Sequence, residues 1–186
     1  MKISKRGEYG LRAMIDLALA RELGRDLVQL SELAESEKIP LKFLEQILLA
    51  LKEGGFLESI RGKYGGYRLA RPAKEIYMGQ LVRYLDGPLA PISCVSQTAY
   101  QRCSCPDETH CGLRMLMLDV RNAITGVLDR YTLANVAEVA LRKMRSNNVV
   151  VPFSQKPIGR GRKAQPGVGV APAETGLTEF FYREGI

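Results

Sequence analysis

Apolar side chains recur every three to four residues along much of the chain, the spacing that one face of an α-helix produces. This pattern predicts helices over about 4–23, 31–38, 40–53, 77–85, 113–130 and 133–144. Strand-like stretches at Phe56–Ile60 and Tyr67–Ala70 flank a glycine-rich turn, Arg61–Gly66, and predict a β-hairpin. A further strand-like piece, Leu27–Leu30, precedes the second helix. We therefore expect a mainly α fold with one small hairpin.

Local signals predict where the helices begin and end. Ser31, followed by acidic residues, is expected to cap the second helix, and Thr132 is expected to cap the last one. Pro40 suits a first helical turn, and Gly54-Gly55 suits a helix end. Two short helices joined by a tight turn and followed by a hairpin form the pattern of a winged helix-turn-helix.

The chain divides into three predicted parts. Residues 1–86 form the winged helix-turn-helix domain, and 87–145 hold a cysteine loop and the dimerisation helices. The apolar stripe of helix 113–130 is larger than helix 133–144 can cover, which predicts a homodimer. Residues 146–186 mix proline, glycine and basic residues without apolar periodicity over most of their length, so we predict a flexible, disordered tail.

Composition and charge narrow the possible functions. Of 186 residues, 46% are hydrophobic, which is enough for a core, and the net charge of +7 favours a polyanionic partner such as nucleic acid. No apolar run approaches the length of about 20 residues that spans a membrane, and no signal peptide is recognisable, so we expect a cytoplasmic protein without a membrane partner. Hydrolase, P-loop and metalloprotease motifs are absent from the sequence, and we expect no enzyme.

Polar side chains at the start of the third helix are candidates for DNA contacts. With the apolar face turned inward, Lys42, Glu45 and Gln46 face outward, where they could reach base edges in a major groove. Arg61 and Lys63 flank a turn whose glycines let the backbone approach phosphates or a narrow minor groove. A winged helix used only as a protein-binding adaptor is the alternative.

All four cysteines lie between Cys94 and Cys111, in a stretch predicted to be a loop. In a reducing compartment such a cluster indicates metal binding or redox sensing before structural disulfides. Soft thiolates suit iron–sulfur clusters or zinc, and the lack of paired C-x-x-C motifs disfavours zinc. A thiol redox switch remains open.

Several segments resemble the bacterial IscR/NsrR/CymR regulators, the Rrf2 family. They are Met1–Ala13, Phe43–Leu48, Ser59–Tyr67, Asp86–Pro91 and Leu128–Leu133. The resemblance covers about residues 1–144 and implies a dimeric winged-helix transcription regulator, usually a repressor, that binds double-stranded operator DNA. It also implies the DNA contacts, which are Lys42, Glu45, Gln46 and Arg61, with Tyr9 and Ser31 as phosphate contacts.

The same resemblance implies an iron–sulfur cluster, most simply [2Fe–2S]. Cys105 and Cys111 have the spacing of the family's last two cysteines, while Cys94 lies farther upstream and Cys103 is extra. The implied ligands are Cys94, Cys105, Cys111 and Glu8 of the partner subunit, with His110 as the second candidate for the fourth position. Cys103 is expected to be dispensable, because two thiols in Cys-x-Cys would have to point the same way. Relatives without a cluster leave open a thiol-based regulator controlled by a partner protein.

One further motif lies in the tail. Gly159–Lys163 contains Arg-Gly-Arg, which faintly resembles the peptides that lie in an A·T-rich minor groove. The alternative is a solvated basic linker.

Overall fold

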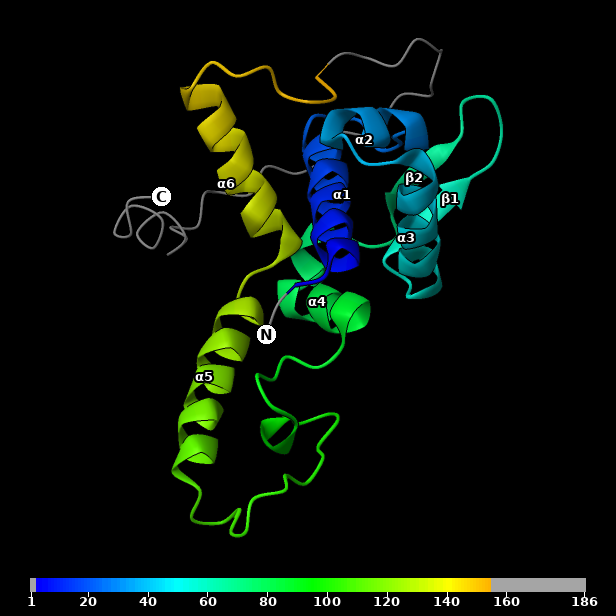
Figure 1. Cartoon of the computed structure of the whole chain (residues 1–186). Helices are drawn as coiled ribbons and strands as arrows, with labels where there is room; N and C mark the ends of the chain where they lie inside the picture. The colour runs from blue at the N-terminus through cyan, green and yellow to red at the C-terminus, as the bar shows by residue number, and fades with distance from the viewer. Residues whose placement is uncertain (1–2, 155–186) are drawn as a thin grey trace.

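The computed structural model describes residues 3–154 (Figure 1), and predictions for 155–186 lie outside the described residues. The order of elements is α1 (Lys5–Glu22), α2 (Leu30–Glu37), α3 (Leu41–Glu53), β1 (Leu57–Ile60), β2 (Gly66–Leu69), α4 (Met78–Asp86), α5 (Gly112–Leu128) and α6 (Leu133–Ser146). Short 3₁₀ turns, η1 and η2, occupy Ala73–Glu75 and Ser93–Val95. The prediction of a mainly α fold with a winged helix-turn-helix is confirmed.

Helix α1 runs through the centre of the core and contacts α2, α3, α4, α6 and β2. From Ala13 to Ala20 its side chains are buried almost all round, including Met14 and Leu17. Helix α3 buries the apolar positions that its spacing predicts, Leu44, Ile47, Leu48 and Leu51. Each such side chain contributes about 1.5–3 kcal/mol when fully buried, so this face holds α3 firmly against α1.

The start of α1 is attached to the end of α4. Ser4 caps α1 by accepting the Gly7 N–H at 3.0 Å, and the Asp86 carboxylate accepts the Ser4 N–H at 2.8 Å and the Ser4 hydroxyl. A Cβ on Gly7 would lie 2.3 Å from Asp86 Oδ2. The glycine is therefore what lets this carboxylate approach the first turn of α1.

The wing is a two-stranded antiparallel sheet in which Leu57 pairs with Leu69 and Ile60 with Gly66. The predicted strand at Leu27–Leu30 is wrong, because only Val28 pairs with the sheet and Leu30 already begins α2. The Val28 and Tyr67 backbones exchange hydrogen bonds of 3.0 and 2.8 Å. Gly66 permits this close approach, since a Cβ there would lie 2.3 Å from the Val28 oxygen.

The predicted cap of α2 is also wrong. The N-cap is Gln29, whose backbone N–H donates to Glu32 Oε2 at 3.0 Å, and Ser31 lies within the first turn. The cap of α6 is confirmed, because the Thr132 hydroxyl accepts the Asn135 N–H at 3.3 Å.

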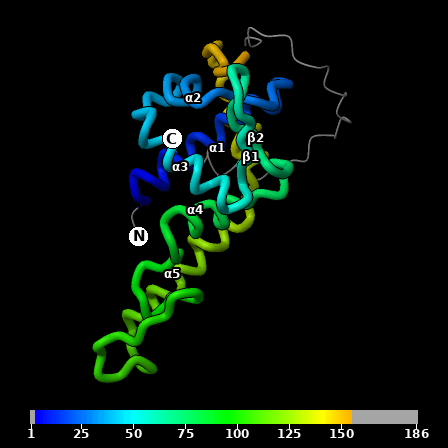
Figure 2. The backbone as a smooth tube through the Cα atoms, turned by 90° about the vertical axis from the view of Figure 1, so that its right-hand side faces the viewer, coloured from blue at the N-terminus to red at the C-terminus, as the bar shows by residue number. Residues whose placement is uncertain are grey.

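Helix α5 and the cysteine loop project from the body at the end opposite the wing tip (Figures 1 and 2). None of the residues of α5 is buried by the part of the chain that the structure describes. Helix α6 returns and packs on α1. Residues 147–154 then fold back, and Val151 and Phe153 pack against the core. The predicted flexible tail therefore does not begin at Ser146. No helix within residues 3–154 is long and apolar enough to cross a membrane.

Candidate nucleic-acid interface and cysteine pocket

The outward face of α3 is polar near the start of the helix. Lys42, Glu45 and Gln46 are all exposed, on the side opposite the buried leucines. Burial, followed by the negative charge of Glu45, raises the pKa of Tyr67 in β2, which places Glu45 where α3 meets the wing. The three predicted side chains thus share one accessible surface beside the hairpin.

The wing tip is basic and is fixed to α2. Arg61 and Lys63 are both exposed in the turn between β1 and β2. Gln29 Nε2 donates to the Lys63 backbone oxygen at 3.3 Å, which ties the wing tip to the start of α2. Ser31, in the first turn of α2, is exposed as well. Sequence reasoning missed Gln29, because its contact spans 34 residues along the chain.

Tyr9 and Glu8 lie on α1 and have different surroundings. The Tyr9 ring packs edge-on against Phe43 of α3, with centroids 5.8 Å apart, which joins the two helices. Glu8 Oε2 is 2.8 Å from Lys5 Nζ, and this hydrogen bond is the main cause of a lowered pKa at Glu8. Glu8 is not among the residues that line the cysteine pocket of its own chain.

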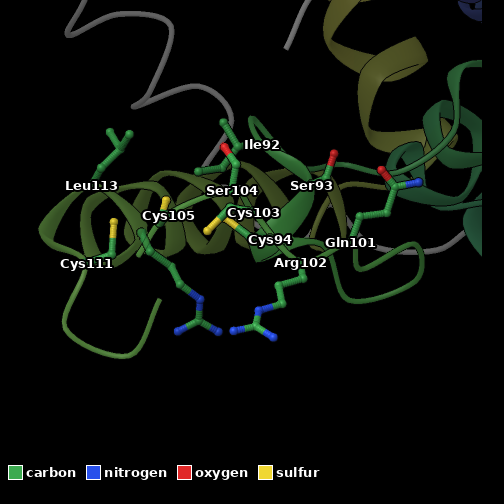
Figure 3. A pocket seen from close by; sticks show the side chains of 11 residues that line it. Ile92, Ser93, Cys94, Gln101, Arg102, Cys103, Ser104, Cys105, Cys111 and Leu113 are labelled. Atoms are coloured by element: carbon green, nitrogen blue, oxygen red, sulfur yellow. The ribbon is translucent and has the colours of Figure 1, made fainter. Parts of the chain in front are cut away.

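The four cysteines line one pocket of about 350 Å³ between the loop and the start of α5 (Figure 3). Cys94 comes from η2 and is buried, while the other three are partly exposed and all four thiols are free. Arg102 and Arg114 also line the pocket. Arg114 Nε lies 3.3 Å from Glu108 Oε1.

The thiols form a connected series in which Cys103 is central. Cys103 interacts with both Cys94 and Cys105, and Cys105 interacts with Cys111. The hydrogen bond between Cys103 and Cys105 lowers the pKa of Cys103 and raises the pKa of Cys105 to about 12. Burial raises the pKa of Cys94. The two thiols of Cys-Ser-Cys therefore interact, and whether Cys103 is dispensable stays a prediction.

The pocket suits an iron–sulfur cluster in its donor chemistry, because thiolates are the usual ligands of such clusters. Its arrangement is not that of a closed metal site: within residues 3–154, no group of three or more His, Cys, Asp or Glu side chains is placed to hold a metal ion. His110 is exposed, and its Nδ1 lies 2.6 Å from Asp107 Oδ2, so its ring is engaged locally. A bound cluster would require the loop to close further or a partner to supply a ligand.

A winged helix with an exposed polar helix face and a basic wing tip defines a class of DNA-binding transcription regulators. The sequence model of the Rrf2 family, described as "Iron-dependent Transcriptional regulator", matches residues 3–139. The chain belongs to the Rrf2 family of transcriptional regulators, and it is accordingly a regulator and not an enzyme.

Individual relatives agree with this assignment. The chain is 37% identical over 136 residues to the HTH-type transcriptional regulator rrf2-like of Rhodobacter capsulatus, covering 72% of this chain and 91% of that protein. The structure of CymR, the global cysteine regulator of B. subtilis, superposes with a TM-score of 0.63 at 32% identity, over 75% of this chain and 98% of that one. T. potens IscR gives a TM-score of 0.58 at 31% identity, over 75% and 88%.

Proposed function

We propose that this chain is a homodimeric, sequence-specific repressor in the cytoplasm that reads operator DNA with α3 and the wing. The observation that carries the proposal is the continuous accessible surface formed by the polar start of α3 and a basic wing tip fixed to α2 by Gln29. Lys42, Glu45 and Gln46 would face the major groove, and Arg61 and Lys63 would face the backbone or the minor groove. Tyr9 and Ser31 are proposed phosphate contacts.

Binding to the DNA upstream of its own gene tests this proposal. Arg61→Ala should weaken operator binding by on the order of 1–3 kcal/mol if Arg61 reads a base or a narrow groove. If Lys42 contacts phosphate, Lys42→Ala should weaken binding to all DNA sequences alike. It should also reduce the slope of log binding constant against log salt concentration by about one. Lys74→Ala, an exposed change in η1, is the control and should bind like the parent. If the Arg61 and Lys42 variants both bind operator DNA like the parent, this surface is not the one that binds DNA.

For the cysteine pocket we propose a sensory iron–sulfur cluster, of the [2Fe–2S] type, held by Cys94, Cys105, Cys111 and the partner subunit's Glu8. The support is the convergence of four thiols on one pocket and the iron-dependent character of the matching family. When bound, the cluster would supply redox and ligand-exchange chemistry. The lowered pKa of Glu8 favours the ionised carboxylate that a ligand needs, and its place on α1 would couple the pocket to the DNA-binding domain.

A specific observation favours a second candidate, a cluster-free thiol switch. The thiols of Cys94 and Cys103 interact, and one of the similar structures is the oxidised form of Staphylococcus aureus CymR. In this mechanism one S–S bond forms between the two residues, and two electrons and two protons pass to hydrogen peroxide, which becomes two water molecules. The free thiols of the described structure are then the reduced state.

Anaerobic purification separates the two candidates. The cluster predicts visible charge-transfer absorption with stoichiometric iron and sulfide, lost in Cys94→Ser, Cys105→Ser and Cys111→Ser and retained in Cys103→Ser. Glu8→Ala should make the cluster less stable and change DNA affinity together. The thiol switch predicts that the purified protein contains no iron. It also predicts that hydrogen peroxide lowers the protein's mass by two hydrogens, measured by mass spectrometry, and that this loss does not occur in Cys103→Ser. Protein that contains no iron, although the cells that express it make iron–sulfur clusters in excess, would contradict the proposal of a bound cluster.

A further inference from the structure

After α6 the chain forms a short strap, residues 147–154, that packs on the DNA-binding domain. The match to the family model ends at residue 139, so the strap lies outside the part of the chain that defines the family. Within the strap, Val151 and Phe153 pack against the hydrophobic core. Figures 1 and 2 both place the orange end of the described chain and the wing tip at the same end of the molecule, away from α5. The strap therefore lies where it can influence the wing.

The backbone of Phe153 has an unusual conformation for its residue type. Its φ of 62° lies in the left-handed region, which bulky side chains rarely adopt. Phe153 follows Pro152 in a turn in which the Ser154 N–H donates to the Val151 oxygen at 3.4 Å. A turn with proline second and a positive φ third usually has glycine or asparagine in the third position. Such a strained residue persists only where its surroundings determine it, which indicates that the packing of this ring outweighs the preference of the backbone.

The Phe153 ring covers the Arg25 guanidinium, in the connection between α1 and α2. The centre of the ring lies 5.7 Å from the guanidinium carbon. Only 10% of the Arg25 side chain is exposed, and its buried Nε has no hydrogen-bond partner within residues 3–154. An aromatic face attracts a cation more strongly where water is excluded, so the ring stabilises a guanidinium that lacks a full set of acceptors. Without the ring, this guanidinium would be open to water.

Arg25 is connected to the wing tip through a series of hydrogen bonds. Arg25 Nη2 donates to both carboxylate oxygens of Glu32, at 2.6 and 2.5 Å. Glu32 Oε2 accepts the backbone N–H of Gln29 at 3.0 Å. Gln29 Nε2 then donates to the Lys63 backbone oxygen at 3.3 Å. Because a charged hydrogen bond is stronger where water is excluded, loss of the ring should weaken the first contact of this series.

We propose that Phe153 is a positioning residue for the wing: by covering Arg25, it holds the wing tip in the orientation that reads operator DNA. This inference rests on the proposed function, which assigns the wing to DNA. A two-stranded hairpin is marginally stable by itself, so its orientation depends on the contacts it makes with the rest of the domain. The backbone bonds between Val28 and Tyr67 hold the base of the wing, whereas the Gln29 side chain acts at its tip.

Two substitutions of Phe153 separate the aromatic face from the apolar bulk, with DNA binding measured by fluorescence anisotropy on the full chain. Phe153→Leu should bind operator DNA about tenfold more weakly, the size expected for a cation–π contact kept from water, and non-operator DNA within about twofold of the parent. Phe153→Tyr retains the face and should bind both DNAs like the parent. The control is Val150→Ala in the same strap, where Val150 is 84% exposed, and it should also bind both like the parent.

A second measurement follows the wing without DNA. The chain contains no tryptophan, so Tyr64→Trp at the exposed wing tip supplies a single fluorescent reporter. In this background Phe153→Leu should lower the anisotropy of the tryptophan, and Val150→Ala should not. Gln29→Ala breaks the last contact of the series and should lower it too. Because the two contacts act in one series, Phe153→Leu combined with Gln29→Ala should lower the anisotropy no further than Gln29→Ala alone.

The contrary results are distinct. Equal weakening of operator and non-operator binding by Phe153→Leu, or binding like the parent, would overturn the positioning role. An additive loss of anisotropy in the combined variant would also overturn it, since the ring and Gln29 would then act separately. If the parent binds no operator DNA, the proposed function is overturned and this proposal with it. If the parent binds and the reporter is unchanged by Phe153→Leu, only this proposal is overturned.

Discussion

At the scale of single residues, Asp16 is an acidic side chain buried in α1. The structure leaves only 3% of Asp16 exposed. Its Oδ2 has no hydrogen-bond partner among the described residues. Burial and then the negative charge of Glu37 raise the pKa of Asp16 to about 7. Glu37 is itself held by Arg12, whose Nε donates to it at 2.5 Å, so Asp16 lies where α1 meets α2.

Asp16 should make the free energy of unfolding depend on pH. Between its ordinary pKa of 3.8 and the folded value of about 7, the folded chain keeps a proton that the unfolded chain has lost. Stability should therefore fall as pH rises from about 4 to about 7, by at most about 1.4 kcal/mol per pH unit, and then level off. Urea unfolding of Asp16→Asn should show that this slope has disappeared, while Asp119→Asn on α5 should retain it. An unchanged slope in Asp16→Asn would show that another group is responsible.

At the scale of elements, α5 has an apolar face that no other element within residues 3–154 covers. Leu113, Leu116 and Val120 are 57%, 56% and 38% exposed and lie on one side of the helix. Helix α6 does not cover them, because its apolar face packs on α1. An exposed stripe of this kind, next to the cysteine pocket, is the surface that a second copy of α5 would bury.

A charge in this stripe should separate the subunits. Leu116→Glu should yield monomers by light scattering with a folded winged helix, because the side chain is exposed in the described chain and a carboxylate there would be buried only in the proposed dimer. Operator affinity should fall with the loss of paired half-sites. Asn122→Glu adds the same charge on the opposite side of α5 and should remain dimeric. A dimeric Leu116→Glu variant would place the interface elsewhere.

At the scale of the whole molecule, the winged helix could be predicted because its signals are local. Periodicity identified every long helix to within a few residues, and the outward face of α3 followed from its buried one. Several of the failures depend on contacts between residues far apart in sequence. Gln29 replaces Ser31 as the cap while its side chain reaches the wing, and Phe153 docks on Arg25 across more than a hundred residues. The meeting of Cys103 with Cys94 likewise depends on how the loop folds.

The bond between Ser4 and Asp86 has a mechanical consequence for the molecule. Asp86 is the last residue of α4, eight residues before Cys94, and Ser4 is four residues before Glu8. One carboxylate therefore joins the first turn of α1 to the segment that leads into the cysteine loop. Gly7 lets the Asp86 carboxylate pack directly against the first turn of α1, so this connection is tight. A displacement of the first residues of the loop would therefore be transmitted to α1, the helix that packs against α3.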